Sequence, residues 1–300
     1  MRQAETHTGG VVLPNIWLLG IRPRTLTMAA VPVVTGAALA WSEGATVNVP
    51  TFAVTLVCAV LIQIGTNLFN DAGDGARGAD GADRIGPVRL TGAGLATARQ
   101  VRGGAAACFA AALAAGIYLV WVGGTVILLI GIASLVSGYA YSSGPRPLSH
   151  GPWSEVWVVA FFGVVAVAGS YYLQALAPPG APVLLTGIAI GCPAAAVLLV
   201  NNVRDREVDR RAGRRTLAGH LEPANARRLY AALMLAPFAV LLIAWGWRPI
   251  GLAWLALPLF VWLVIRLNRL PAGPAMNAQL ARTSLAQTVL GALFCLEVLT

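Results

Sequence analysis

The feature that most constrains this chain is a series of apolar stretches, each of about 20 residues, that recurs along nearly all of its 300 residues. A helix rises ~1.5 Å per residue and the hydrocarbon core of a bilayer is ~30 Å thick, so ~20 apolar residues are enough for one span. The composition agrees, because 57% of the residues are hydrophobic, 11% are charged and the mean hydropathy is +0.72. The sequence therefore predicts an all-α integral membrane protein of about nine transmembrane helices.

The predicted spans share high apolar content and polar or glycine-rich borders. They lie at about 24–42, 50–70, 98–121, 124–142, 154–177, 181–201, 226–246, 249–267 and 278–299. Arg99 and Arg102 fall in the first turns of the third span, and Gly123-Gly124 separates this span from the next. We expect residues 1–300 to form one membrane domain with two similar halves, at about 14–150 and 151–300.

The distribution of arginine predicts the orientation. The chain has no lysine, and 20 of its 21 arginines lie before span one, in the connections after spans two, four, six and eight, or on the flanks of those connections. Only Arg248 lies on the other side. The positive-inside rule then places the N-terminus and these connections in the cytoplasm, with the protein in the cell membrane. Because topology explains much of the sequence pI of about 10.3, the basic character does not call for a nucleic-acid partner.

Aspartate is confined to two long connections that are predicted to face the cytoplasm. All six Asp residues of the chain lie at about 70–97 or 202–225. In the first connection, Asn67, Asp71 and Asp74 lie at positions i, i+4 and i+7, with Asn70 beside them. If span two continues as a helix, they form one stripe.

The second connection repeats this arrangement after span six. Asn202, Asp205 and Asp209 lie at i, i+3 and i+7, and Asp205 follows Asp71 by 134 positions. The equivalent places of the two motifs indicate an internal duplication, with an active site between the halves.

Clustered carboxylates repel one another and require a cation. Oxygen ligands without His or Cys select a hard ion, so we expect Mg²⁺, with two ions and with Mn²⁺ as an alternative. Mg²⁺ commonly joins carboxylates to substrate phosphates, and arginine suits bidentate phosphate contacts. Arginines accompany both motifs: Arg77, Arg84, Arg89, Arg204, Arg206, Arg210, Arg211, Arg214 and Arg215. The other interpretation is a pair of solvated loops, in which the positive-inside rule alone accounts for many of these arginines.

At these motifs the sequence resembles the UbiA superfamily of intramembrane prenyltransferases. Asn70-Asp71-Ala-Gly-Asp74 fits the first motif of that superfamily, and the run from Asn202 to Asp209 fits the second, with Val203 where many members have Asp. Four further segments resemble the members that prenylate 1,4-dihydroxy-2-naphthoate in menaquinone synthesis. They are Arg22-Pro-Arg24-Thr25-Leu26, Gly78 to Arg89, Tyr141 to Leu148, and Asn201-Asn202 with Gly213 to Leu217.

The resemblance implies a UbiA-type helical bundle and a membrane-bound transferase. Its substrates would be a polyprenyl diphosphate and 1,4-dihydroxy-2-naphthoate, and its products a demethylmenaquinol, CO₂ and diphosphate. The implied metal ligands and catalytic residues are Asp71, Asp74, Asp205 and Asp209. The implied substrate-binding residues are Asn67, Asn70, Asn202, Arg22, Arg84, Arg89, Arg215 and Tyr141. Whether Asp80 or Asp83 also contacts metal is left open.

Two alternatives remain at this point. The first is a prenyltransferase of the same superfamily that uses another acceptor. The second is a membrane transporter with acidic cation sites, whose ligands should lie near the bilayer midplane on interrupted helices. No Asp lies within a predicted span, which favours chemistry at the membrane surface.

Overall fold

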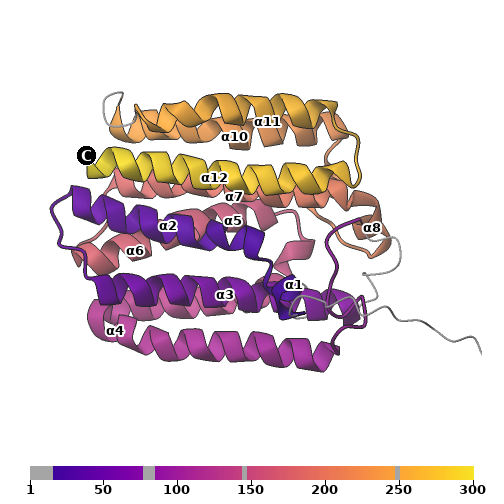
Figure 1. The fold of residues 1–300 in the computed structure, drawn as a ribbon, viewed down its shortest axis with the longest axis horizontal. Helices are drawn as coiled ribbons and strands as arrows, with labels where there is room; N and C mark the ends of the chain where they lie inside the picture. Colours follow the sequence, from indigo (N-terminus) through magenta and orange to yellow (C-terminus); the bar gives the residue numbers. More distant parts are fainter. Residues whose placement is uncertain (1–15, 77–84, 144–146, 247–250) are drawn as a thin grey trace, which may run out of the picture.

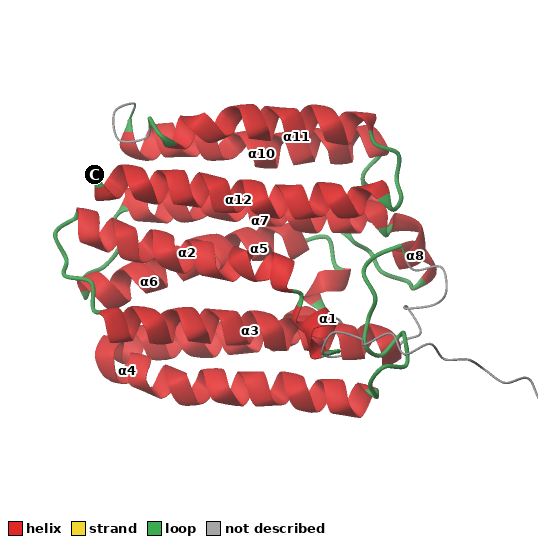
Figure 2. Ribbon diagram, viewed as in Figure 1, coloured by secondary structure: helices red, strands yellow, loops and turns green. Residues whose placement is uncertain are grey.

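The computed structural model describes residues 16–76, 85–143, 147–246 and 251–300. Every regular element in these ranges is a helix (Figure 2), so the predicted all-α class is confirmed. The helices of the first half are α1 (Trp17–Ile21), α2 (Pro23–Ser42), α3 (Val49–Ala76), α4 (Ala98–Ser142) and η1 (Leu148–His150). Those of the second half are α5 (Ser154–Val159), η2 (Ala160–Val165), α6 (Ala166–Ala175), α7 (Ala181–Arg204), α8 (Arg206–Arg211), α9 (Leu217–His220), α10 (Pro223–Trp245), η4 (Ala253–Ala256), α11 (Leu257–Arg269) and α12 (Ala275–Leu299).

In the described part of the chain, seven helical segments are long and apolar enough to cross a membrane. One of them, α4, has 45 residues and is interrupted at Gly124, whose φ of 63° and ψ of −151° are not helical. This break falls where the sequence predicts two separate spans. The predicted span at 249–267 corresponds to η4 and α11, which are shorter than the other segments. The total of nine spans and the side of the N-terminus stay predictions, as does the division into two similar halves.

Small residues allow the central helices to pack with their backbones almost in contact. A Cβ added at Gly36 of α2 would lie 2.3 Å from the carbonyl oxygen of Val167 in α6. A Cβ at Gly163 of η2 would lie 2.3 Å from the carbonyl oxygen of Gly187 in α7. Such close approach is how helices associate within lipid, where the hydrophobic effect does not drive helices together.

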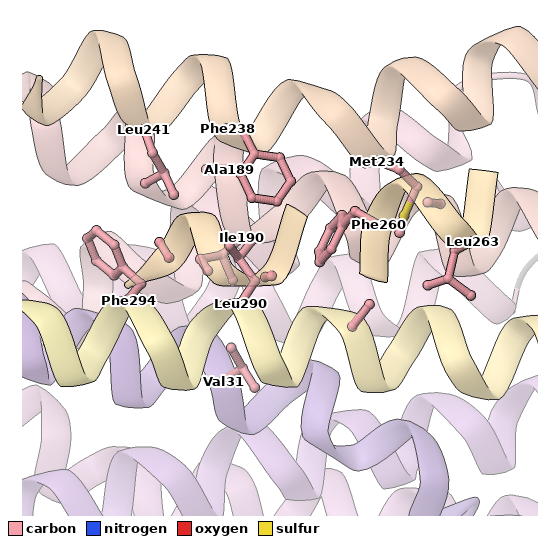
Figure 3. Close-up of a cluster of buried hydrophobic side chains, with 14 of the residues drawn as sticks. Val31, Ala189, Ile190, Met234, Phe238, Leu241, Phe260, Leu263, Leu290 and Phe294 are labelled. Carbon is pink, nitrogen blue, oxygen red and sulfur yellow. The ribbon is translucent and has the colours of Figure 1, made fainter. Parts of the chain in front are cut away.

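The second half of the chain contains the largest buried apolar cluster. Figure 3 shows side chains of α7, α10, α11 and α12 filling the space between these helices, including Ile190, Phe238, Phe260 and Phe294. Several polar side chains are buried with them and make hydrogen bonds; Tyr230 Oη, for example, lies 2.8 Å from Thr283 Oγ1. This half of the bundle is therefore a packed core.

The two aspartate motifs lie at the same end of the bundle, on the right in Figure 1. The helix α3 continues to Ala76, beyond the predicted end of span two near residue 70, so the condition under which Asn67, Asp71 and Asp74 share one helix is met. The second motif differs, because α7 ends at Arg204 and Asp205 has φ −93° and ψ 6° before α8 begins. This break separates Asp209 from the axis of α7.

Candidate functional site

A cavity of about 840 Å³ is lined by residues of the two aspartate motifs and by helices from both halves of the bundle. Its size is typical of a small-molecule site. The lining is polar near the ends of α3 and α7, and apolar farther along the helices. The apolar part includes Ile62, Leu119, Ile127, Phe161 and Leu173. A ligand with a charged head and a long hydrocarbon chain would match this distribution.

Asp74 and Asp209, from different motifs, are joined by one guanidinium. Arg214 donates to Oδ1 of Asp74, although the two residues are 140 positions apart. It also donates to Oδ1 of Asp209 over 3.2 Å. Arg89 donates to the other oxygen of Asp74 over 2.8 Å. The expectation that the two motifs meet in space is thus met by a direct contact.

Asp71 faces the later part of the first connection. Its Oδ2 accepts the Leu90 backbone N–H at 2.8 Å, and its Oδ1 accepts the Thr91 backbone N–H at 3.0 Å and the Thr91 hydroxyl at 2.6 Å. The Asp71 residue is only 1% exposed. Its carboxylate therefore fixes this segment, which carries Arg89, against α3.

Asp205 is held by its neighbour in sequence. Nε and Nη2 of Arg204 donate to its two oxygens over 2.7 and 2.6 Å. Arg204 also donates to the side-chain oxygens of Asn201 and Asn277, over 2.8 and 2.7 Å. Asn277 in turn donates to the carbonyl oxygen of Ile85 over 3.0 Å. This network links α7, α12 and the later part of the first connection.

One asparagine of each motif is held by a hydrogen bond that its side-chain nitrogen donates. The nitrogen of Asn67 donates to the carbonyl oxygen of Ile21 over 3.1 Å, and the nitrogen of Asn202 donates to Oε1 of Glu155 over 2.9 Å. A carbonyl and an ionised carboxylate only accept hydrogen bonds. Among the described residues neither amide oxygen accepts a hydrogen bond, so both oxygens are available to a ligand in the cavity that both residues line.

Glu155 is a site residue that the sequence reasoning did not select. It is 4% exposed at the start of α5, and the Ser154 hydroxyl donates to its Oε2 over 2.9 Å. The signal was an acidic residue at the border of a predicted span, where a charge is costly unless it is used.

The pKa of Asp209 reflects the crowding of charges. Burial raises the pKa of this carboxyl to about 6, the Arg214 guanidinium lowers it, and the nearby carboxylates of Asp205 and Asp74 raise it again. Burial and negative neighbours together exceed the effect of the arginines. The site therefore favours the addition of positive charge.

The other predicted site residues fall into three groups. Asn70, Arg22 and Tyr141 line the cavity, and Arg22 has a left-handed backbone (φ 57°) between α1 and α2. Arg215 has an exposed side chain, and its backbone N–H donates to the carbonyl oxygen of His150. Arg84, Asp80 and Asp83 lie outside the described residues.

The donors present suit a hard divalent ion, with one qualification. Asp74, Asp205 and Asp209 supply carboxylate oxygens, and Asn67 and Asn202 supply amide oxygens. The three carboxylates are near one another, since those of Asp74 and Asp205 raise the pKa of Asp209. Within the described ranges, no group of three or more His, Cys, Asp or Glu side chains is arranged to hold a metal ion. The carboxylates are bonded to arginines instead, so an ion would have to exchange with these bonds.

Comparison with known proteins identifies the family to which the chain belongs. Residues 29–292 match the model of the UbiA prenyltransferase family, and the chain belongs to that family. A 1,4-dihydroxy-2-naphthoate octaprenyltransferase of Mycobacterium leprae (strain TN) is 35% identical over 277 residues, which are 91% of this chain and 92% of the relative. The protein of the same description from Mycobacterium tuberculosis (strain ATCC 25618 / H37Rv) is 38% identical over 240 residues, 79% of this chain and 81% of the relative.

A solved structure confirms the fold. The structure of a UbiA homolog from Archaeoglobus fulgidus, bound to DMAPP and Mg²⁺, superposes with a TM-score of 0.62 and covers 94% of this chain and 98% of its own, at 18% sequence identity. The predicted UbiA-type bundle and the membrane character are therefore correct.

Proposed function

We propose that this prenyltransferase joins a polyprenyl group, from polyprenyl diphosphate, to 1,4-dihydroxy-2-naphthoate. The products would be a demethylmenaquinol, CO₂ and diphosphate, as in menaquinone synthesis. The observation that carries the proposal is the contact of Arg214 with Asp74 and Asp209, which unites both motifs at the polar end of a cavity with an apolar interior. The described activity of the mycobacterial relatives supports the choice of acceptor.

The proposed metal is Mg²⁺, as two ions, with Mn²⁺ as a possible substitute. Asp71 and Asp74 would hold one ion and Asp205 and Asp209 the other, with Asn67, Asn70 and Asn202 as supporting ligands. The Mg²⁺ of the Archaeoglobus homolog supports this choice. When bound, the ions neutralise the diphosphate as it leaves. Asp71 differs from the other three, because its two oxygens accept hydrogen bonds from Leu90 and Thr91 rather than from an arginine.

The residues of the chain supply positioning and charge. Arg89 and Arg214 lie beside Asp74 and can contact diphosphate oxygens, and Arg22 lines the cavity. The C–O bond of the prenyl diphosphate breaks with its electron pair leaving on the diphosphate, and the electron-rich ring carbon that bears the carboxylate forms the new C–C bond. The bond from this carbon to the carboxylate then breaks, which releases CO₂ and returns its electron pair to the aromatic ring. The apolar walls exclude water, which would otherwise capture the allylic cation. Tyr141, which also lines the cavity, would face that cation through its ring.

The proposed location is the cell membrane, with the site on the cytoplasmic side. The distribution of arginine supports this orientation, because the arginine-rich connections after spans two and six contain the site.

The test is prenyl transfer in liposomes with purified protein, Mg²⁺, radiolabelled polyprenyl diphosphate and 1,4-dihydroxy-2-naphthoate. We expect a prenylated product that disappears with EDTA and in Asp74→Asn and Asp205→Asn. Glu207→Gln is the matched control, because this side chain is 70% exposed and pairs only with Arg210 among the described residues. Product with 4-hydroxybenzoate or homogentisate alone would replace the acceptor. Cation flux from folded protein that makes no product with any acceptor would favour the transporter.

A further inference from the structure

Gln63 is a buried amide in the cavity that the proposed reaction has not yet used. It lies in α3 one turn before Asn67, lines the cavity and is 8% exposed. Its Oε1 is buried and accepts no hydrogen bond within the described part of the chain. A buried polar atom without a partner costs free energy in a protein and more in a membrane, where water does not compensate. Such an atom at a cavity wall indicates a ligand.

Other buried glutamines show the contrast. Gln279 and Gln287 in α12 also leave Oε1 without a partner, but their nitrogens tie helices together by donating to the carbonyl oxygens of Leu263 and Ile190. Neither of them lines the cavity among the residues described. Gln63 makes no hydrogen bond of this kind among the described residues, so helix packing does not account for it.

The chemistry of the unpartnered atom selects which substrate it serves. An amide oxygen only accepts hydrogen bonds, so its ligand must donate one. The diphosphate oxygens are acceptors and the prenyl chain is a hydrocarbon, whereas each hydroxyl of a dihydroxynaphthoate is a donor. We propose that Gln63 Oε1 accepts a hydrogen bond from a ring hydroxyl of the aromatic acceptor and so determines which acceptors bind. This assignment rests on the proposed function.

A second unpartnered atom in the same cavity fits this ligand. Nε1 of Trp157 in α5 is buried, and no acceptor for its N–H lies within the described ranges. An indole N–H only donates. A hydroxyl both donates and accepts, so a ring with two hydroxyls can satisfy Gln63 and Trp157 together. The binding site for the acceptor would then lie one helical turn deeper than the amide of Asn67.

The test compares Gln63→Met with the wild type in the transfer assay. Methionine keeps the length and removes the amide. We expect the KM for 1,4-dihydroxy-2-naphthoate to rise about tenfold, the effect of one lost hydrogen bond to a buried group. The KM for prenyl diphosphate and the Mg²⁺ concentration for half-maximal rate should not change. Gln279→Met is the matched control, since it removes a buried amide outside the cavity and should leave the acceptor KM unchanged even if stability falls.

Substrate analogues make the assignment specific. 1-Hydroxy-2-naphthoate and 4-hydroxy-2-naphthoate each lack one hydroxyl, and their inhibition constants are measured on both proteins. In the wild type, the analogue without the bonded hydroxyl should bind about tenfold more weakly than the other, and Gln63→Met should abolish this difference. A difference that persists in Gln63→Met, or a rise in both KM values together, would overturn the assignment. Failure of the wild type to prenylate the naphthoate would instead overturn the proposed function, so the two failures are distinct.

Discussion

Replacing Arg214 with Gln should show how strongly the contact between the two motifs stabilises the protein without metal. Removing one member of a buried ion pair costs about 3 to 5 kcal/mol, because the remaining charge stays buried. Asp74 keeps its bond to Arg89, and the Arg214 side chain is 15% exposed, so we take the lower figure. At roughly 2 °C per kcal/mol for a chain of this size, the apparent Tm in EDTA should fall by about 6 °C.

Adding Mg²⁺ should reverse most of this loss. In the variant, a divalent ion can neutralise Asp74 and Asp209 without displacing a guanidinium. The ion should therefore raise the apparent Tm of Arg214→Gln more than that of the wild type. The assay is a thermal unfolding series in detergent with increasing Mg²⁺, followed by intrinsic fluorescence.

An exposed arginine of the same loop region, Arg210, provides the control. Arg210→Gln removes an arginine that is 77% exposed and pairs with Glu207, itself 70% exposed. Surface pairs of this kind contribute little, so the Tm of this variant should match the wild type. Equal Tm values for Arg214→Gln and Arg210→Gln in EDTA, or equal Mg²⁺ responses of Arg214→Gln and the wild type, would refute the reasoning.

Three further predictions concern the carboxylates. Burial raises the pKa of Asp209 to about 6, above its unfolded value, so in the metal-free protein its contribution to stability is present at low pH and lost as pH rises through about 6. Protons should therefore compete with Mg²⁺ below that pH, and the half-saturating Mg²⁺ concentration should rise as pH falls from 7 to 5; a flat profile would contradict the assignment. Glu155→Met removes the acceptor that holds the Asn202 amide and should raise the Mg²⁺ requirement about 10-fold or more, with a smaller change in KM for the naphthoate; equal changes in both would count against a positioning role. Thr91→Val removes the hydroxyl bond to Asp71 and should lower stability by about 1 kcal/mol, measured by denaturant unfolding, and an unchanged midpoint would show that the two backbone bonds suffice.

The sequence predicted the all-α class and an active site to which both aspartate motifs contribute. Hydropathy predicted the long apolar helices, seven of which, in the described part of the chain, are long and apolar enough to cross a membrane. Gly123-Gly124 predicted the break that the structure has at Gly124. Helical spacing placed Asn67, Asp71 and Asp74 on one stripe on condition that span two continues as a helix, which α3 does. These features depend on local composition and periodicity, which a single sequence records.

The partners of each charged group were not predictable in the same way. Arg214 and Arg215 are adjacent and equivalent in type, yet Arg214 joins the motifs while Arg215 is exposed. Asp71 binds Leu90 and Thr91, in a segment without regular structure, so no periodicity predicts the contact. Gln63 is recognisable as a binding residue only from its position in the cavity. In each case the deciding factor is tertiary placement, which residue type and spacing leave open.

The balance of charge at the site suggests the order in which its ligands bind. Three carboxylates of the site are bonded to three arginines: Asp74, Asp205 and Asp209 with Arg89, Arg204 and Arg214. The two other described carboxylates of the site, Asp71 and Glu155, are held by uncharged donors. Two divalent ions added alone would bring more positive charge than these two carboxylates balance, because the arginines remain beside them. Ions that arrive with a diphosphate bring most of the balancing negative charge and give the displaced arginines new anionic partners. Under the proposed function, Mg²⁺ should therefore bind the wild type weakly alone and much more tightly with prenyl diphosphate, and calorimetric titrations that give the same Mg²⁺ affinity with and without diphosphate would exclude this coupling.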